Sequence, residues 1–279
     1  MIRLWDEGDT VGDRGQDALR RNNVRITGNP DGQPILFVHG FGGSQETWHA
    51  MTPEFEADYR VILMDHVGSG DSDVSAYDRA KYDSLHGYVD DLLEIIETLT
   101  LHDVVFVGHS VSALMGVLAV NRAPELFDRL VLVGPSPRYI DADGYVGGFS
   151  QEAIDDLLNS LDSNYLGWSS AMASTLMGNA ERPELRTTLE ESIRTIDPAI
   201  ASQFARVTFL SDNRRDLADV TVPALVLQST EDVIASYEVG KYVHENIPNS
   251  EFVLMESRGH LPNLSHPAEV SRHIKAFLG

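Results

Sequence analysis

Apolar residues in this chain recur as short runs, each followed by glycine or polar residues. Six runs have the length of a single strand, at residues 35–38, 61–64, 104–107, 130–133, 224–227 and 252–255. Continuous apolar runs of this length are typical of strands that are covered on both faces. Helical patterns lie between most of them, as at 85–99. Strands that alternate with helices predict a mostly parallel sheet with helices on both faces.

The alternation stops between residues 136 and 213. No strong strand run occurs there, and four helical patterns follow one another instead, at 151–161, 165–177, 183–193 and 198–210. Gly178, Pro183 and Asp197-Pro198 separate these patterns. We therefore expect an inserted helical segment over 136–213 and a core built from 21–135 and 214–279.

Residues 1–20 are polar and acidic, with several glycines. Segments of this composition bury too little apolar surface to offset the loss of chain entropy on folding. We expect a flexible acidic leader over 1–20, and we expect function to survive its loss.

Composition excludes several classes of function. The 279 residues include no cysteine, so disulfides and thiolate chemistry are excluded. The formal net charge of −22 would repel nucleic acid and anionic lipid surfaces. We find neither an apolar stretch long enough to span a membrane nor the pattern of a signal peptide. These features predict a soluble cytoplasmic protein that binds neither nucleic acid nor membrane.

The segment VVFVGHSVSAL at 104–114 carries the most specific chemistry. A buried strand leads into Ser110, which has Gly108 two residues before it and a helix of small residues after it. This pattern is typical of a nucleophile elbow, G-x-S-x-G, in which a sharp turn exposes a serine at the top of a sheet. Ser112 stands where the second glycine is usual. The alternative interpretation is a serine that only caps a helix.

Polar residues after other strands could activate Ser110. Ligands bind outside the carboxyl ends of the strands in an open parallel sheet. Asp232 follows the fifth apolar run and His260 follows the sixth. A histidine can take the proton of the serine, and a carboxylate can hold that histidine in the right tautomer. We predict a catalytic Ser110, Asp232 and His260. Glu231 is the alternative acid, and His260 could instead be structural.

The turn HGFGG at 39–43 follows the first run. Its glycines allow the backbone to expose the N–H of Phe41, and Val111 supplies a second N–H, so the two would form an oxyanion hole. A plain glycine loop is the alternative. A nucleotide site is unsupported because neither the dinucleotide fingerprint nor the P-loop is complete. The histidines do not form an H-E-x-x-H motif, so we expect no metal and no cofactor.

Several motifs together resemble one family, the α/β-hydrolases typified by the bacterial stress-response regulator RsbQ and the plant karrikin and strigolactone receptors. They are HGFGGSQETW, RVILMDHVGSGDSD, VGHSVSALMGVLA, RLVLVGPSPRY, GGFS, IASQFARVTFLSDNR, QSTEDVIA and RGHLPNLSHP. The resemblance covers the chain from about Asn22 to the end. The serine at position 112 is the residue found in the plant receptors, whereas much of the remaining sequence is closer to that of the bacterial regulator.

The resemblance implies an α/β-hydrolase fold in which a four-helix lid covers a hydrophobic pocket. The residues at matching pocket positions are Phe41, His109, Phe149, Trp168, Phe204 and Ile234. On the sequence alone, the aromatic ones are more simply interpreted as core. Such a pocket would accept a small, mainly apolar ligand with an ester, lactone or enol-ether bond.

Two classes of function follow from this resemblance. One is a ligand-processing regulator of a signalling partner, which in the bacterial relative is a PAS-domain phosphatase. The other is a metabolic carboxylesterase without a signalling role. A haloperoxidase or dehalogenase on the same fold is disfavoured, because dehalogenases place a carboxylate where Ser110 stands.

Overall fold

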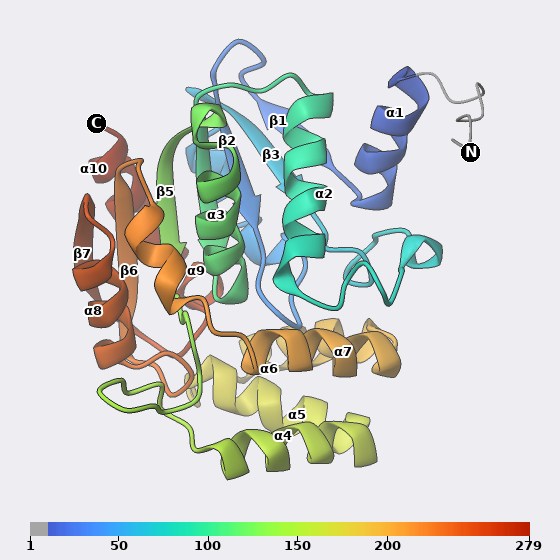
Figure 1. Ribbon diagram of the computed structural model, residues 1–279, viewed down its shortest axis with the longest axis vertical. Helices are drawn as coiled ribbons and strands as arrows, with labels where there is room; N and C mark the ends of the chain where they lie inside the picture. The colour runs from blue at the N-terminus through green and yellow to red at the C-terminus, as the bar shows by residue number, and fades with distance from the viewer. Residues whose placement is uncertain (1–10) are drawn as a thin grey trace, which may run out of the picture.

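The computed structural model describes residues 11–279. Seven strands form one sheet in the order β1-β3-β2-β4-β5-β6-β7 (Figure 1). All neighbouring strands are parallel except β1, which runs antiparallel to β3. The six strands predicted from apolar runs are confirmed, and they are β2 (Gln33–Val38), β3 (Tyr59–Met64), β4 (Val104–His109), β5 (Phe127–Val133), β6 (Ala224–Glu231) and β7 (Ser250–Arg258).

The apolar pattern did not predict β1 (Arg25–Gly28). All four of its residues are exposed, and its sequence RITG contains a single large apolar side chain. Ile26 pairs with Ile62 of β3 at the edge of the sheet. Because this edge strand has one neighbour and no buried face, its backbone hydrogen bonds need no apolar run beside them.

Helices cover both faces of the sheet, as predicted. Successive side chains of a strand point to opposite faces. Leu36 and Val38 of β2 therefore pack with α2 (Leu85–Thr98), α3 (Val111–Arg122) and α8 (Tyr237–Asn246) on one face. Ile35 and Phe37 pack on the other face with Trp48 and with α10 (Pro267–Leu278).

Shorter helices connect these elements. They are η1 (Gln45–Trp48), η2 (Thr52–Glu54), η3 (Val74–Ala76), η4 (Pro124–Leu126), η5 (Arg214–Asp219) and α9 (Pro262–Ser265). Within residues 11–279, no helix combines the length and the apolar character needed to cross a bilayer.

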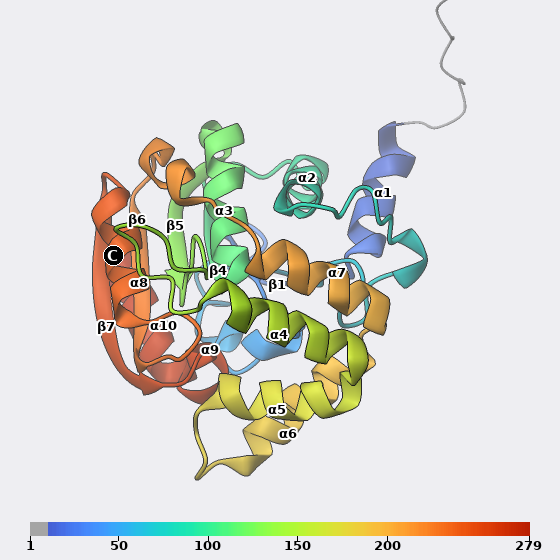
Figure 2. The same cartoon turned by 60° about the horizontal axis from the view of Figure 1, so that its bottom comes forward.

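Four helices inserted between β5 and β6 form the predicted lid (Figures 1 and 2). The residues that separate the predicted helical patterns also end or begin the observed helices. Gly178 ends one helix in the left-handed conformation, and the Asp197 side chain accepts hydrogen bonds from two amides at the start of another. The four helices are α4 (Gln151–Ser163), α5 (Tyr165–Met177), α6 (Pro183–Thr195) and α7 (Pro198–Phe209).

The chain enters and leaves the lid at a closed neck. The amide of Asn213, after α7, donates a hydrogen bond of 2.8 Å to the carbonyl of Pro137, before α4. Next to it, Arg138 Nη1 forms an ion pair of 2.8 Å with Asp212 Oδ2. The two segments that join the lid to the sheet are therefore bonded to each other.

Helix α1 (Val11–Arg21) corrects the prediction of a flexible leader for residues 11–20, whereas residues 1–10 lie outside the described residues. The helix lies beside α2 (Figure 1), and Ala18 is fully buried. Arg21 Nη2 donates to Asp91 Oδ1 at 2.8 Å and to Glu94 Oε2 at 2.7 Å, both on α2. Charged contacts with residues distant in the sequence hold α1 in place. The sequence therefore contains no apolar run from which this helix could be predicted.

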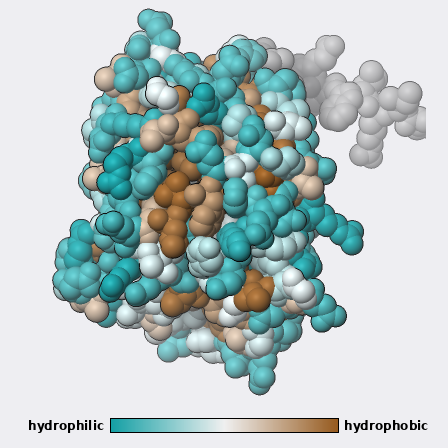
Figure 3. All heavy atoms as spheres, turned by 90° about the vertical axis from the view of Figure 1, so that its left-hand side faces the viewer, coloured by the Kyte–Doolittle hydropathy of each residue, from teal (hydrophilic) through white to brown (hydrophobic). Residues whose placement is uncertain are grey.

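Exposed apolar side chains gather on the face that carries β7 and α8 (Figure 3). β7 is the second edge of the sheet. Leu254 of β7 is 47% exposed and Tyr237 of α8 is 41% exposed. This face lies at the side of the sheet, away from the strand ends that carry the site.

Candidate active site

Ser110 sits on a sharp turn between β4 and α3. Its φ of 57° and ψ of −125° are strained for a residue with a side chain. Its amide donates to the carbonyl of Val133 at 2.8 Å, which ties the turn to β5. A Cβ atom on Gly108 would lie 2.5 Å from the carbonyl oxygen of Ser112, so only glycine lets the helix turn back this closely. This is the strand-turn-helix geometry expected of 104–114.

The structure brings Ser110, His260 and Asp232 together. His260 Nε2 lies 2.7 Å from Ser110 Oγ, and His260 Nδ1 lies 2.7 Å from Asp232 Oδ2. All three residues are buried. With the Nδ1 proton directed to Asp232, Nε2 is free to accept the hydroxyl proton of Ser110.

Asp232 is held as a carboxylate. The amides of Ile234 and Ala235 donate to Oδ1 at 2.8 and 3.0 Å. Burial by itself raises the pKa of Asp232, but its attraction to His260 and these hydrogen bonds outweigh burial, so the pKa lies below its ordinary value. The alternative acid, Glu231, points to solvent beside Arg258, with its side chain 64% exposed.

The two amides expected to form an oxyanion hole lie on adjoining segments. The amide of Gly43 donates to the carbonyl of Gly40 at 3.2 Å, which closes a turn around Phe41. A Cβ on Gly40 would lie 3.0 Å from Ser110 Cβ, so the turn passes directly against the elbow. Among the described residues, neither the Phe41 amide nor the Val111 amide donates to an acceptor. Both are available to a ligand oxygen.

Three buried polar residues beneath the elbow were not assigned from the sequence. Ser112 Oγ donates to the carbonyl of His39 at 2.5 Å, and His66 Nε2 lies 2.8 Å from Ser112 Oγ. Burial lowers the pKa of His39, and burial followed by repulsion from His39 lowers that of His66 well below the ordinary value. Both histidines are therefore neutral near pH 7. The serine in place of a glycine was the sequence signal for this cluster.

Tyr139 is a second residue that the sequence analysis did not assign. It is buried, and its ring centroid lies 5.0 Å from that of Phe209 in α7. Burial raises the pKa of Tyr139, and the neighbouring Ser110 acts in the opposite direction. Tyr139 is therefore a neighbour of the proposed nucleophile. Its signal was the motif GPSPRY, which was used only for the resemblance.

The residues expected to line a pocket fall into two groups. Phe41, Phe149, Trp168 and Ile234 share one apolar cluster with the lid, and the ring centroids of Phe41 and Trp168 are 6.0 Å apart. The ring centroid of Phe204 lies 5.4 Å from that of Phe41 and 4.6 Å from that of a core tyrosine of α2, on which it stacks. Phe204 thus joins the pocket cluster to the core.

His109 differs from the other expected pocket residues in its bonding. Its Nε2 donates to the backbone carbonyl of His260 at 2.7 Å. Burial, with added repulsion from His260, lowers the pKa of His109 to about 3, so the ring is neutral. The structure therefore places His109 as a support of the loop that carries His260.

Two lid helices bond directly to the loops of the site. The His260 amide donates to the carbonyl of Leu176 in α5 at 2.7 Å. Ser192 Oγ of α6 donates to the carbonyl of Gly42 at 3.0 Å. A displacement of the lid would therefore disturb the loop of His260 and the turn of Phe41.

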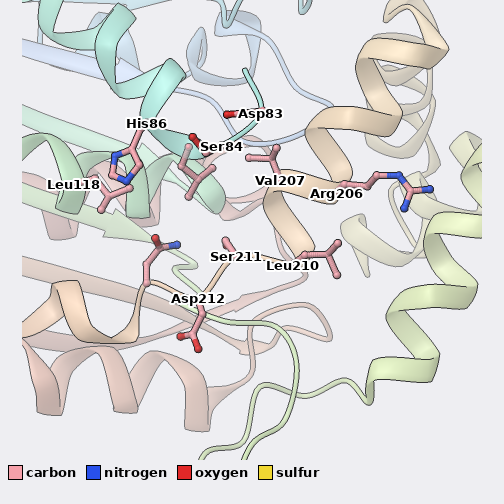
Figure 4. Close-up of a pocket in the computed structure, with 11 residues that line it drawn as sticks. Asp83, Ser84, His86, Leu118, Arg206, Val207, Leu210, Ser211 and Asp212 are labelled. Carbon is pink, nitrogen blue, oxygen red and sulfur yellow. The ribbon is translucent and has the colours of Figure 1, made fainter. Parts of the chain in front are cut away.

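A surface groove of about 390 Å³ has none of the triad residues in its lining (Figure 4). It opens where α2 begins and α7 ends, and none of its lining residues belongs to the expected pocket. Its walls are formed by Asp83, Ser84, Leu85, His86, Leu118, Arg206, Val207, Leu210, Ser211, Asp212 and Asn213.

The fold and this constellation define a class of protein. A parallel sheet with a serine on a strand-to-helix turn, followed in the chain by an acid and a histidine on later strand ends, is the arrangement of α/β-hydrolases. The profile of the Alpha/beta hydrolase family matches residues 35–273, and the chain belongs to this family.

Individual relatives narrow the comparison. The chain is 36% identical to the strigolactone esterase D14 of Arabidopsis thaliana, over 94% of this chain and 98% of that protein. It is 36% identical to the Karrikin insensitive 2 receptor CA of Petunia hybrida, over 88% of this chain and 91% of that protein. A solved structure of a hydrolase from Oleispira antarctica superposes with a TM-score of 0.91 at 38% identity, covering 94% of this chain and 96% of that chain. The resemblance of the motifs to the α/β-hydrolases and to the plant karrikin and strigolactone receptors is confirmed.

Proposed function

We propose that this protein is a serine hydrolase of small, mainly apolar esters, lactones or enol ethers. The observation that carries the proposal is the pair of 2.7 Å contacts from Ser110 to His260 and from His260 to Asp232. A serine hydroxyl is a weak nucleophile by itself, and this arrangement supplies both the base and the group that orients it.

In the proposed reaction of an ester or lactone, Ser110 Oγ bonds to the carbonyl carbon of the substrate while its proton passes to His260 Nε2. The carbonyl electron pair moves onto oxygen, where the amides of Phe41 and Val111 donate hydrogen bonds. As the carbon–oxygen bond of the ester breaks, His260 returns the proton to the departing oxygen. Water then cleaves the acyl-serine by the same sequence and releases the acid. In a lactone, the departing oxygen stays attached to the acyl group.

Labelling tests the assignment of the nucleophile. A fluorophosphonate should add once to the wild-type protein, on Ser110, because that hydroxyl is paired with a histidine that an acid orients in the proposed triad. Intact mass and peptide mapping will locate the adduct. The Ser110→Ala variant should remain folded and stay unlabelled. An unmodified Ser110 beside an adduct elsewhere would reject the assignment.

The lid restricts the proposed substrates to small ones. Ser110 is 5% exposed, and the aromatic side chains of Phe41, Phe149 and Trp168 lie in the cluster between the lid and the strand ends. We expect slow turnover that falls steadily from acetyl to palmitoyl esters of one alcohol, as measured by initial rates. Rates that rise toward the long chains would contradict a closed pocket.

We further propose that hydrolysis serves regulation of a signalling partner. One relative is named a receptor and another an esterase, so both roles occur on this fold. The bond from the His260 amide to Leu176 offers a route by which acylation of Ser110 could alter the lid surface.

Affinity capture from the native cell, with wild type and Ser110→Ala in parallel, tests the regulatory role. We expect a signalling protein, such as a PAS-domain phosphatase, to bind the two forms to different extents. If neither form retains such a protein and deletion of the gene only abolishes growth on a particular ester, the protein is a metabolic carboxylesterase.

A further inference from the structure

Ser112 stands where a nucleophile elbow usually has glycine, and its side chain is fully buried. Its hydroxyl donates to the His39 carbonyl at 2.5 Å. His66 Nε2 lies 2.8 Å from Ser112 Oγ and 3.1 Å from the same carbonyl. These residues follow β2, β3 and β4, three strands that are neighbours in the sheet. One hydroxyl thus joins three strand ends.

The hydrogen bonds define where the protons of this cluster lie. The His66 amide donates to His39 Nε2 at 3.1 Å, so that nitrogen carries no proton. His39 Nδ1 therefore carries the proton and donates to the Gly40 carbonyl at 2.8 Å. His66 Nε2 faces two oxygens and acts as a donor. Because the hydroxyl of Ser112 is occupied by the His39 carbonyl, it takes no part in proton transfer at Ser110.

The positions of the bonded residues matter for the oxyanion site. Ser112 is adjacent to Val111, and His39 lies two residues before Phe41. The bond from Ser112 to the His39 carbonyl therefore links the two backbone segments that carry the proposed oxyanion amides. We infer that Ser112 is a positioning residue that fixes the separation of these amides, an inference that rests on the proposed hydrolase function. A glycine at this position would leave that separation to backbone packing alone.

The expected effect is on the rate of the chemical step. Loss of one oxyanion donor lowers kcat by roughly 10²–10³-fold. Replacement of Ser112 leaves both donors in the chain but held less well, so we expect a smaller loss, about tenfold in kcat, or ~1.4 kcal/mol. KM should change less than about twofold, because an interaction made only in the transition state contributes to kcat rather than to ground-state binding.

The test compares Ser112→Ala and Ser112→Gly with the wild type. Initial rates with a p-nitrophenyl acetate series give kcat and KM, and competition with an arylboronic acid reports affinity for a tetrahedral anion. We expect both variants to lose kcat and boronate affinity by similar factors. His66→Phe keeps a ring against its aromatic neighbours but removes the donor, and it should move both values in the same direction by less.

Ser250→Ala is the matched control. Ser250 Oγ also donates to backbone carbonyls, those of His244 and Ile247, but at the amino end of β7. This variant should lose stability at most and keep both constants. If Ser112→Ala keeps the kcat and boronate affinity of the active wild type, or if Ser250→Ala loses them equally, the positioning role is rejected. A wild type without turnover or acylation of Ser110 would instead reject the hydrolase function itself.

Discussion

Two neighbouring carboxylates, Glu231 and Asp232, end in opposite environments. β6 and β7 change register between Ser229 and Glu231, and the chain beyond this point turns toward the site. Glu231 faces solvent, whereas Asp232 is buried, accepts two backbone hydrogen bonds and contacts His260. In the sequence, the only argument for Asp232 was that apolar residues follow it directly. The structure adds the physical reason, which is the burial of Asp232 and its contact with His260.

This difference predicts the effect of removing each charge. Asp232→Asn should lower kcat for a small ester by about 10⁴-fold, because the amide no longer holds the proton of His260 on Nδ1. Glu231→Gln is the matched control and should keep nearly the wild-type rate. Steady-state kinetics of both variants check this. If Glu231→Gln lost activity while Asp232→Asn kept it, the acid would be misassigned.

At the scale of whole elements, the sheet and the lid could be predicted because buried positions leave a pattern of apolar residues in the sequence. Runs such as 104–107 had to be apolar because helices cover both of their faces, and the lid helices carried their own stop signals. β1 and α1 lacked such marks, since β1 is exposed and α1 is held by the ion pair of Arg21 with Asp91. Contacts between residues 70 positions apart leave no periodic trace in a sequence.

The candidate site divides in the same way. Ser110, Asp232 and His260 were predictable because each directly follows a recognisable strand. The roles of His66, Ser112 and Tyr139 depend on partners from other strand ends. The sequence contains these residues but does not say which of them meet.

The anchoring of α1 can be tested through Arg21, whose side chain is 11% exposed, against 1% for Asp91. Arg21→Met should reduce the free energy of unfolding by about 2 kcal/mol, less than the ~3–5 kcal/mol typical of a broken buried pair, because Lys81 also contacts Asp91. Esterase activity should persist, since α1 is remote from the triad.

The control for this prediction is Arg20→Met. Arg20 is exposed and pairs with Asp17 and Asp73 at the surface, so its removal should change the urea midpoint little. Equal midpoints for wild type and Arg21→Met would show that α1 does not stabilise the core.

At the scale of the whole molecule, three buried histidines couple folding to pH. The folded-state pKa values of His39, His66 and His109 all lie below the ordinary value, with burial as the largest cause. The unfolded chain therefore binds more protons than the folded one below about pH 6.5. The stability that these neutral rings contribute is fully present above that pH and is lost as the pH falls.

We expect the free energy of unfolding to decrease between about pH 6.5 and 5, by up to ~1.4 kcal/mol per pH unit for each such histidine. Urea titrations across this range will measure it. In His66→Phe, the number of protons taken up on unfolding should fall by about one, which makes the slope of the free energy of unfolding against pH smaller. A change at the exposed His102, such as His102→Gln, should leave this slope unchanged. A slope that is the same in all three proteins would exclude this coupling.

The closed neck of the lid has a consequence for how such proteins diversify. The chain enters beside Arg138 and leaves beside Asp212, and every residue of the proposed triad and oxyanion site lies outside this insertion. The neck therefore marks two adjacent points at which one lid could be exchanged for another while the strands of the sheet and their order stay the same. A new lid would have to keep the bonds of Leu176 to the His260 amide and of Ser192 to the Gly42 carbonyl, so the pocket above the site can change its shape only within the limits that these two contacts set.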